Sequence, residues 1–490
     1  MDPGRGLVSR RKPFAPTSAA DPDAVVVGSG PNGLVAAITL ASAGWKVLVL
    51  EASSTPGGGM RSAELVRPGV VHDVCSAVHP LGLASPALRD LPLSDHGLRW
   101  VHPAVPLAHA LDTGAVLLHR SVEETANGLG PDGDAYRRLL APLVADGTAL
   151  TDALLSPRSV PRSGFGALAR YGLVGLRSAD GLARARFEAP EAPAMFAGLA
   201  AHSILSLGAP ITAGYGLMFA VLGHLVGWPV AEGGSQSVAD ALVSLLGSLG
   251  GEVACDRRVT SLDDLPPARA VLLDLSPRDV VAIGRSRLPS RYARSLERFR
   301  YGPGVHKVDW VLDGPVPWTD PACARAATVH VGGTRAEISA AEDEVQRGRH
   351  PERPFVLFSQ ASGFDPTRAP AGIHTGWGYC HVPNGSTVDV TDRIEAQIER
   401  FAPGFRERIL DRHVMRTDAM ERYNPNYVGG DINGGAADLW QFVARPTLHL
   451  DPWATPVDGL YLCSASTPPG GGVHGMAGRH AARSVLRHHG

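Results

Sequence analysis

Three glycines and one acidic residue near the N-terminus are spaced for chemistry on a dinucleotide. Gly28, Gly30 and Gly33 follow a short apolar run, and Glu51 ends the next apolar run. Gly28 permits a tight turn, Gly30 lets the backbone approach a pyrophosphate, and Gly33 allows a helix to pack closely on a strand. The start of that helix presents free N–H groups and a positive dipole end to phosphates. Glu51 is placed to accept ribose hydroxyls, so this unit predicts a dinucleotide site.

A second glycine turn follows the acid directly. Residues 57–59 are consecutive glycines, and Arg61 lies two residues later. A simple nicotinamide dehydrogenase has no evident use for this turn, whereas a longer cofactor can pack its diphosphate against the backbone amides and its ring system near Arg61. No arginine follows Glu51 immediately, which disfavours a 2′-phosphate on the ribose.

The C-terminal end repeats the order of strand, glycine loop and helix. Residues 459–465 have the pattern of a strand, residues 470–472 are glycines, and a helical run extends from about Gly475 to Leu486. A helix start with small residues stabilises negative charge, as on a reduced ring cofactor. The sequence therefore predicts that two distant helix starts converge on one extended ligand.

On these motifs the chain resembles the phytoene desaturase and amine oxidase superfamily of FAD enzymes. There, a double-glycine motif with an arginine follows the acid, and a Pro-Gly-Gly-Gly-Val loop precedes the last helix, as at residues 57–61 and 469–473. The resemblance runs from about Val25 onward. It implies an α/β fold, in which a Rossmann-like FAD-binding domain carries an interleaved α+β substrate domain, and non-covalent FAD. The residues that it implies for FAD binding are Gly28, Gly30, Pro31, Asn32, Gly33, Glu51, Ala52, Gly58, Gly59, Met60, Arg61, Val259, Ala465, Gly472, Val473, His474, Gly475 and Met476.

The resemblance also predicts a discontinuous domain organisation. The FAD-binding domain is expected at residues 21–100, 229–285 and 445–490, and the substrate domain at 101–228 and 286–444. Residues 1–20 are interpreted as a disordered leader. They contain Arg10 and Arg11 but no apolar stretch of the kind that follows in a twin-arginine export signal.

Residues 192–231 contain no Asp, Glu, Lys or Arg. Pro210, several glycines and two histidines interrupt the segment, so a membrane-spanning helix is not predicted. Two interpretations stay open. The segment forms core helices of the substrate domain, or its helices line an apolar tunnel or touch a bilayer surface to collect a lipid-like substrate.

Lys307 is the candidate catalytic residue. It lies in an alternating run, residues 304–312, that predicts a strand. In amine oxidases a lysine on such a strand reaches a water near flavin N5, and the alternative is a solvated lysine on an exposed face. Asp431 and Asn433 belong to a glycine-rich segment that either faces the pocket or forms a structural loop.

Composition excludes several other classes. The net charge of -2 gives no basic field for nucleic acid, so small molecules are the expected partners. The five cysteines are far apart with no CxxC pair, which argues against a disulfide framework or a zinc site, and no metal is predicted. A cytoplasmic protein is expected, with peripheral membrane contact left open. The sequence gives no oligomeric state.

The resemblance implies removal of hydrogen from an apolar organic substrate by hydride transfer to flavin N5, with carotenoid or other polyene desaturation as the first substrate class. No second GxGxxG occurs, so electrons are expected to leave to a diffusible acceptor, either oxygen or a quinone. Two alternatives stay open. One is an amine or amino-acid oxidase, with an aromatic cage or a carboxylate-binding arginine. The other is a non-catalytic binding protein that resembles Rab GDP-dissociation inhibitors, which the intact glycine and acid positions disfavour.

Overall fold

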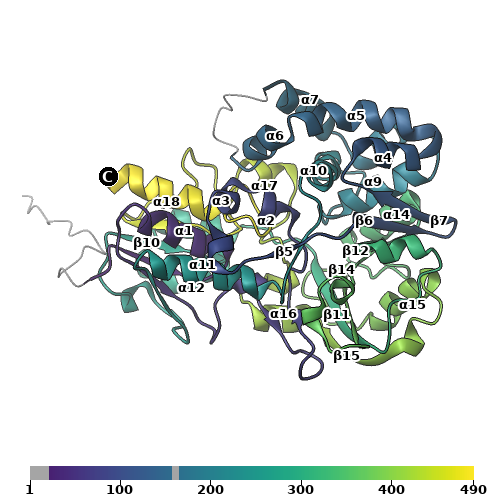
Figure 1. Cartoon of the computed structure of the whole chain (residues 1–490). Coiled ribbons are helices and arrows are strands. Elements are labelled where there is room, and N and C mark those ends of the chain that lie inside the picture. The colour runs from purple at the N-terminus through teal and green to yellow at the C-terminus, as the bar shows by residue number, and fades with distance from the viewer. Residues whose placement is uncertain (1–20, 157–164, 490) are drawn as a thin grey trace, which may run out of the picture.

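The computed structural model describes residues 21–156 and 165–489, and two sheets organise it (Figure 1). The first sheet contains five strands in the order β16-β10-β1-β2-β9, and every pairing in it is parallel. Its strands are β1 (Ala24–Val27), β2 (Val47–Leu50), β9 (Glu252–Ala254), β10 (Ala270–Leu273) and β16 (Leu460–Leu462). Parallel strands need crossover helices on the faces, so short and almost wholly apolar strands of this kind are expected at its centre.

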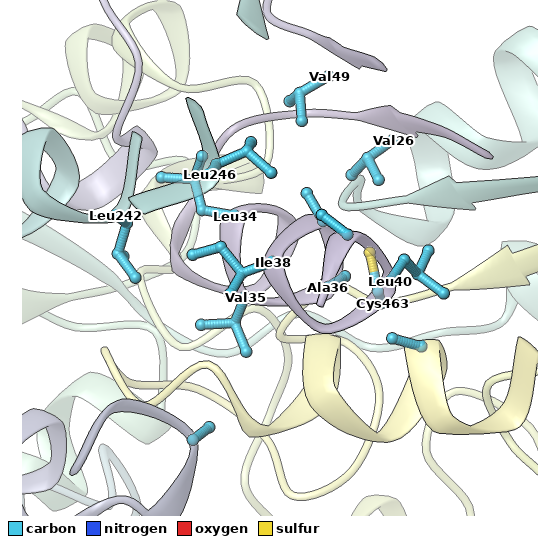
Figure 2. Packing of buried hydrophobic residues seen from close by; sticks show 14 of the residues in the cluster. Val26, Leu34, Val35, Ala36, Ile38, Leu40, Val49, Leu242, Leu246 and Cys463 are labelled. Carbon is cyan, nitrogen blue, oxygen red and sulfur yellow. The ribbon is translucent and has the colours of Figure 1, made fainter. Parts of the chain in front are cut away.

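Helix α1 (Pro31–Ala41) lies at the centre of this part of the molecule. It packs between α11 (Gln236–Ser248) and α18 (Met476–His489), beneath the sheet. Figure 2 shows side chains of α1 directed toward the strands, toward α11 and toward α18. Because α1 is covered on nearly every side, its sequence is apolar all round rather than striped.

The first glycine turn brings strand β1 and helix α1 into backbone contact. A Cβ on Gly33 would lie 2.1 Å from the carbonyl oxygen of Gly28. Pro31 stands at the first position of α1, where a missing N–H costs no intrahelical hydrogen bond. Glycine is therefore required at position 33 because the helix packs closely on the strand there, as the sequence predicts.

The second sheet has seven strands in the order β15-β11-β14-β13-β12-β6-β7. The β6 and β12 strands pair in parallel and the other neighbours are antiparallel. Both faces are covered, so all nine residues of β11 are buried. The strands are β6 (Val105–Leu111), β7 (Gly114–Leu118), β11 (Gly304–Leu312), β12 (Ala326–Val331), β13 (Val356–Ser359), β14 (His374–Val382) and β15 (Ile409–Met415).

Helices cover the seven-stranded sheet from two sides (Figure 1). Side chains of α15 (Thr391–Phe401) pack on one face. A helical layer covers the other, and it includes α9 (Glu191–Ala201) and α10 (Thr212–Leu225). The rest of the layer comprises α4 (Val122–Gly128), α5 (Gly133–Ala145), α6 (Gly147–Leu154), α7 (Phe165–Gly175) and α8 (Ala179–Arg186), with α14 (Arg335–Gln346) beside α9.

The uncharged segment at 192–231 forms most of α9 and α10, which are largely buried against each other. Within the described residues, none of the helices has the length and apolar character needed to cross a bilayer. Most residues of the segment are therefore core residues, as the first interpretation predicts. A few residues of the segment also line the cavity described below.

The α/β fold with a Rossmann-like parallel sheet is confirmed, and its strands fall in the three stretches expected for FAD binding. The strands of the second sheet fall in the two substrate stretches. A two-stranded ribbon pairs β5 (Trp100–Val101) with β8 (Val230–Ala231). It lies where the chain passes from the FAD-binding stretch to the substrate stretch and where it returns. The expected domain boundaries stay a prediction, and the leader at 1–20 lies outside the described residues.

Candidate active site

A cavity of ≈ 580 Å³ extends from the carboxyl ends of β1, β2 and β10 to the seven-stranded sheet. Val27 and Leu50, the last residues of β1 and β2, line one end, and Leu357 and Tyr379 of the other sheet line the opposite end. Ligands of open parallel sheets bind at the carboxyl ends of the strands, so the location fits a cofactor site.

Glu51 is held in place by the first glycine turn. One carboxylate oxygen accepts the Ser29 backbone N–H at 2.9 Å and the Ser29 hydroxyl at 2.5 Å. The other oxygen accepts the Ser53 N–H at 2.8 Å. These donors fix the carboxylate at the cavity wall, where a ribose-binding acid is expected.

The two glycine turns pack directly on each other. Gly57 donates its N–H to the Ser29 carbonyl at 3.0 Å, and a Cβ on Gly58 would lie 2.9 Å from the Cα of Gly30. Arg61 follows the second turn, donates to the carbonyl of Gly58 at 3.0 Å and lies 4.2 Å from the centre of the Tyr423 ring. The glycine positions of both turns have no room for a side chain, so backbone groups form much of this wall of the cavity.

Asp274 is a further residue of this wall, which the sequence analysis did not identify. It follows β10, lines the cavity and accepts the Gly33 N–H at 3.0 Å. Burial, together with the charge of Glu51, raises the pKa of Asp274 to about 7. Its sequence signal is an acid at the end of a buried apolar run, which is also the signal that identified Glu51.

The C-terminal glycine loop reaches the same cavity. Gly472 and Val473 line it, and Gly472 has a φ of 117°, which favours glycine. His474 lies behind the loop, where its Nε2 donates to the Gly470 carbonyl at 3.1 Å and its Nδ1 accepts the Met476 N–H at 3.0 Å. The imidazole therefore fixes the loop and the start of α18, and burial lowers the pKa of His474 to about 4.

Most of the predicted cofactor residues gather around this one cavity. Gly33, Met60, His474, Gly475 and Met476 pack behind its wall, and the two methionines belong to the core around α1. Whether each residue contacts FAD stays a prediction. The predicted residues that line the cavity are Gly28, Gly30, Pro31, Asn32, Glu51, Ala52, Gly58, Gly59, Arg61, Val259, Ala465, Gly472 and Val473.

Lys307 is neither solvated nor part of the cavity wall. It is 1% exposed and forms an ion pair with Asp309, which is also buried. Its ammonium lies 5.8 Å from the centre of the Trp377 ring, and that ring does line the cavity. The Trp377 side chain therefore separates Lys307 from the cavity. The catalytic role of Lys307 stays a prediction.

Aromatic and aliphatic side chains form the end of the cavity that faces the seven-stranded sheet. Of the described lining residues that come from the seven-stranded sheet and from the segment 192–231, none is Asp, Glu, Lys or Arg. Burial lowers the pKa of His79 to about 4 and that of His202 to about 3, so both rings are neutral near pH 7. The aromatic members are Phe219, Trp228, Trp377 and Tyr379.

Three residues of the uncharged segment, His202, Phe219 and Trp228, line this apolar end. The segment is thus both core and cavity wall. Asn433 also lines the cavity, whereas Asp431 accepts N–H groups from its own loop and from Gly302 at 2.7 to 2.8 Å. Across the described chain, no group of three or more His, Cys, Asp or Glu side chains is arranged to hold a metal ion.

Comparison with known proteins agrees with this geometry. The family model of an NAD(P)-binding Rossmann-like domain matches residues 26–91. The rat protein named pyridine nucleotide-disulfide oxidoreductase domain-containing protein 2 is 26% identical, over 95% of this chain and 93% of that protein. A lycopene-forming phytoene desaturase from Paracoccus is 23% identical, over 58% of this chain and 60% of that protein.

Solved structures share the fold across nearly the whole chain. An oxidoreductase from Methanosarcina mazei superposes with a TM-score of 0.63 at 16% identity, over 95% of this chain and 99% of that chain. Putrescine oxidase with bound putrescine gives a TM-score of 0.59 at 19% identity, over 95% and 98% of the two chains. The chain is thus similar in sequence to a phytoene desaturase and in fold to putrescine oxidase, and with the glycine turns, the acid and the parallel sheet these likenesses support an oxidoreductase.

Proposed function

We propose that the chain binds FAD non-covalently and oxidises an uncharged, largely apolar small molecule. One observation carries the proposal: a single cavity joins a glycine-walled end that holds Glu51 to an aromatic end without ionised side chains. The first end suits a charged dinucleotide, and the second suits a neutral substrate.

The residues at the polar end fit FAD. The glycine turns expose backbone where any Cβ would clash, and the start of α1 faces the cavity through Gly30, Pro31 and Asn32. The side-chain oxygen of Asn32 is buried and has no hydrogen-bond partner among the described residues, so it is available to a ligand. Gly28, Gly30 and Gly58 would hold the diphosphate, Glu51 the ribose and Val259 the adenine.

A bound flavin supplies the capacity to take a hydride from a C–H bond. The protein has three tasks. The glycine loop at Gly472 and the start of α18 offer positive dipole ends for developing negative charge. The aromatic residues exclude water and orient the substrate. Gly472 and the aromatic side chains line the cavity, and the start of α18 lies behind the loop.

The character of the apolar end selects among substrates. A carboxylate-binding arginine is missing from the described lining of that end, which disfavours an amino-acid oxidase. A polyene fits the uncharged wall, and the phytoene desaturase relatives support it as the first substrate class. An amine is the second substrate class, because Trp377 and Tyr379 line the cavity and aromatic ring faces attract amino groups.

The test is anaerobic mixing of the FAD-loaded protein with polyenes, amines and hydroxylated compounds while the flavin absorbance is followed. Bleaching by a polyene supports the first substrate class, and bleaching by an amine alone replaces it with the second. A protein that stays colourless after incubation with excess FAD would instead favour a non-catalytic binding role. Reoxidation with oxygen or a quinone then identifies the acceptor.

A further inference from the structure

We propose that His202 is a catalytic residue that accepts the proton lost by the substrate, and that His330 positions it. The inference rests on the proposed function, since it concerns the substrate end of the same cavity. It assigns roles to a pair of histidines that the sequence pattern did not connect.

His202 lies just after α9, where the uncharged segment meets the cavity. Its ring packs 4.5 Å from the ring of Phe219 and 5.4 Å from that of Trp228, and all three residues line the cavity. The other histidine of this lining, His79, is 1% exposed and bonds the hydroxyl of Ser235 at 2.8 Å. His202 is only partly buried, so its ring is the more accessible of the two.

The seven-stranded sheet places His330 behind His202. The strand register aligns His109, His330, Leu357 and Tyr379 in one row across four strands, and Leu357 and Tyr379 of that row line the cavity. His330 is 0% exposed, and its ring lies 5.3 Å from that of Phe355. The row therefore holds the imidazole of His330 in a fixed position directly behind the cavity wall.

The contact between the two histidines restricts their protonation. The Nε2 atoms of His202 and His330 lie 3.0 Å apart, so only one of them carries the hydrogen of this bond. When His202 donates, its Nδ1 has a free lone pair. That Nδ1 has no hydrogen-bond partner in the described part of the chain, and it can accept a proton from a substrate in the cavity.

The surroundings keep both rings neutral. Burial, together with the neighbouring His381, lowers the pKa of His202 to about 3. Burial also places the pKa of His330 well below its usual value, with contributions from His202 and His109. Glu342 of α14 is occupied by His381, because its carboxylate accepts from Nδ1 of His381 at 2.8 Å. His202 is therefore in its basic form throughout the physiological pH range.

The proton balance of the oxidation requires such an acceptor. One C–H bond of the substrate loses its hydrogen with both electrons, as hydride, to the flavin oxidant of the proposed function. The neighbouring C–H or X–H bond loses its hydrogen as a proton to Nδ1 of His202, and its electron pair becomes the second bond of the new double bond. Because loss of hydride leaves an electron-poor carbon, this proton is strongly acidic, and a weakly basic imidazole suffices.

The test compares His202→Gln and His202→Phe with the wild type, using the compound that bleaches the wild-type flavin in the anaerobic series. General-base catalysis contributes about 100-fold or more, so both variants should lose that much in the rate of flavin reduction with FAD content retained. His330→Phe, which removes the partner of Nε2, should slow reduction about tenfold, and His330→Gln should recover most of it.

The matched control is His306→Gln. His306 is also buried, bonds Thr391 through Nε2 at 3.0 Å and does not line the cavity, so its replacement should leave the reduction rate unchanged. If His202→Gln is reduced as fast as the wild type, His202 is not the base, while the proposed function stands. If no compound reduces the flavin of the wild type, both the proposed function and this inference are wrong.

A second measurement uses the protein without cofactor. In spectra of protein with ¹⁵N-labelled histidine, the signals lost in His202→Gln belong to His202. They should show a neutral ring from pH 5 to pH 8, with chemical shifts that change in His330→Phe. A His202 ring that is charged at pH 7, or signals indifferent to residue 330, would overturn the pairing even if both variants fold and bind FAD.

Discussion

The carboxylate of Asp274 accepts the backbone N–H of Gly33 at 3.0 Å, across 241 positions of sequence. The same carboxylate oxygen would lie 2.7 Å from a Cβ on Gly30. Strand β10 therefore closes the first glycine turn with a side chain, whereas Gly28 and Gly33 meet backbone to backbone. A side chain at Gly30 would therefore clash with the Asp274 side chain, whereas one at Gly33 would clash with backbone.

Gly30→Ala should reduce FAD loading, because the new Cβ meets the Asp274 carboxylate. Combining it with Asp274→Ala should restore part of the loading, since the clash is with the end of a side chain. Gly33→Ala should not be rescued in this way, because its Cβ would lie 2.1 Å from the Gly28 carbonyl. The measurement is the ratio of flavin to protein after incubation with excess FAD. Equal rescue of both glycine variants by Asp274→Ala would contradict this account of the turn.

Asp274→Asn should change how stability depends on pH. The folded carboxyl holds its proton up to about pH 7, because burial and the charge of Glu51 disfavour ionisation, whereas the unfolded carboxyl loses it near pH 4. Between these values the unfolded state binds fewer protons, so this residue makes the wild type less stable as pH rises. Asparagine does not titrate, and its side-chain oxygen can still accept the Gly33 N–H.

Urea unfolding of the cofactor-free protein at several pH values measures this effect. The stability of Asp274→Asn relative to the wild type should increase from pH 4.5 to pH 7 by on the order of 3 kcal/mol and then level off. The nearby titratable groups are Glu51 and the buried thiol of Cys463, and both remain in the variant. A difference that stays constant over this range would show that Asp274 ionises normally in the folded protein.

The local pattern was enough to predict the cofactor end of the cavity. Strand, glycine turn, helix, strand and acid follow one another within about thirty residues, and each has a short-range signature. Asp274 has only the acid after an apolar run, without a glycine turn beside it, and His330 has no such signature. Each acquires its position through strand pairing with segments far away in sequence, and a lone acid or histidine after an apolar run is compatible with many folds.

The alternation around Lys307 was interpretable as a strand, but it could not show that both faces of that strand are covered. One face of β11 packs under α15, and Lys307 lies on the other, directly across from Tyr379. A sequence with one alternating strand does not reveal which helices cover it, so the solvated alternative for Lys307 looked reasonable and is wrong for this protein.

Lys307→Met should destabilise the fold by about 3 to 5 kcal/mol, because it leaves the buried Asp309 carboxylate without its ion-pair partner. Adding Asp309→Leu should recover much of this loss, since the unpaired charge is removed as well. Denaturant unfolding of the two single variants and the double variant measures the coupling. The rate of flavin reduction per bound FAD tests whether Lys307 also has a catalytic role. A Lys307→Met variant that is folded and FAD-loaded but slow would support catalysis by Lys307. An unchanged rate would show that Lys307 is not catalytic.

An exposed apolar segment, residues 439–450, is where the peripheral membrane contact that the sequence left open can be tested. It follows Asn433 and Gly434, which line the cavity, and Trp440 is 66% exposed. Contiguous exposed apolar residues of this kind mark contact surfaces, and aromatic side chains favour the interface of a bilayer. Its exposed large side chains are Leu439, Trp440, Phe442, Val443, Leu448 and Leu450.

Replacing Trp440 and Phe442 together with serine should weaken co-sedimentation with phosphatidylcholine vesicles at least about tenfold, because each aromatic ring contributes roughly 2 kcal/mol of apolar transfer. Salt should have little effect, since the chain has a net charge of only -2 and the contact is apolar. Leu173→Ser is the matched control, because Leu173 is 80% exposed on α7, outside this segment. Equal loss in the control would indicate non-specific adsorption, and no sedimentation of the wild type would exclude a bilayer as the partner of residues 439–450.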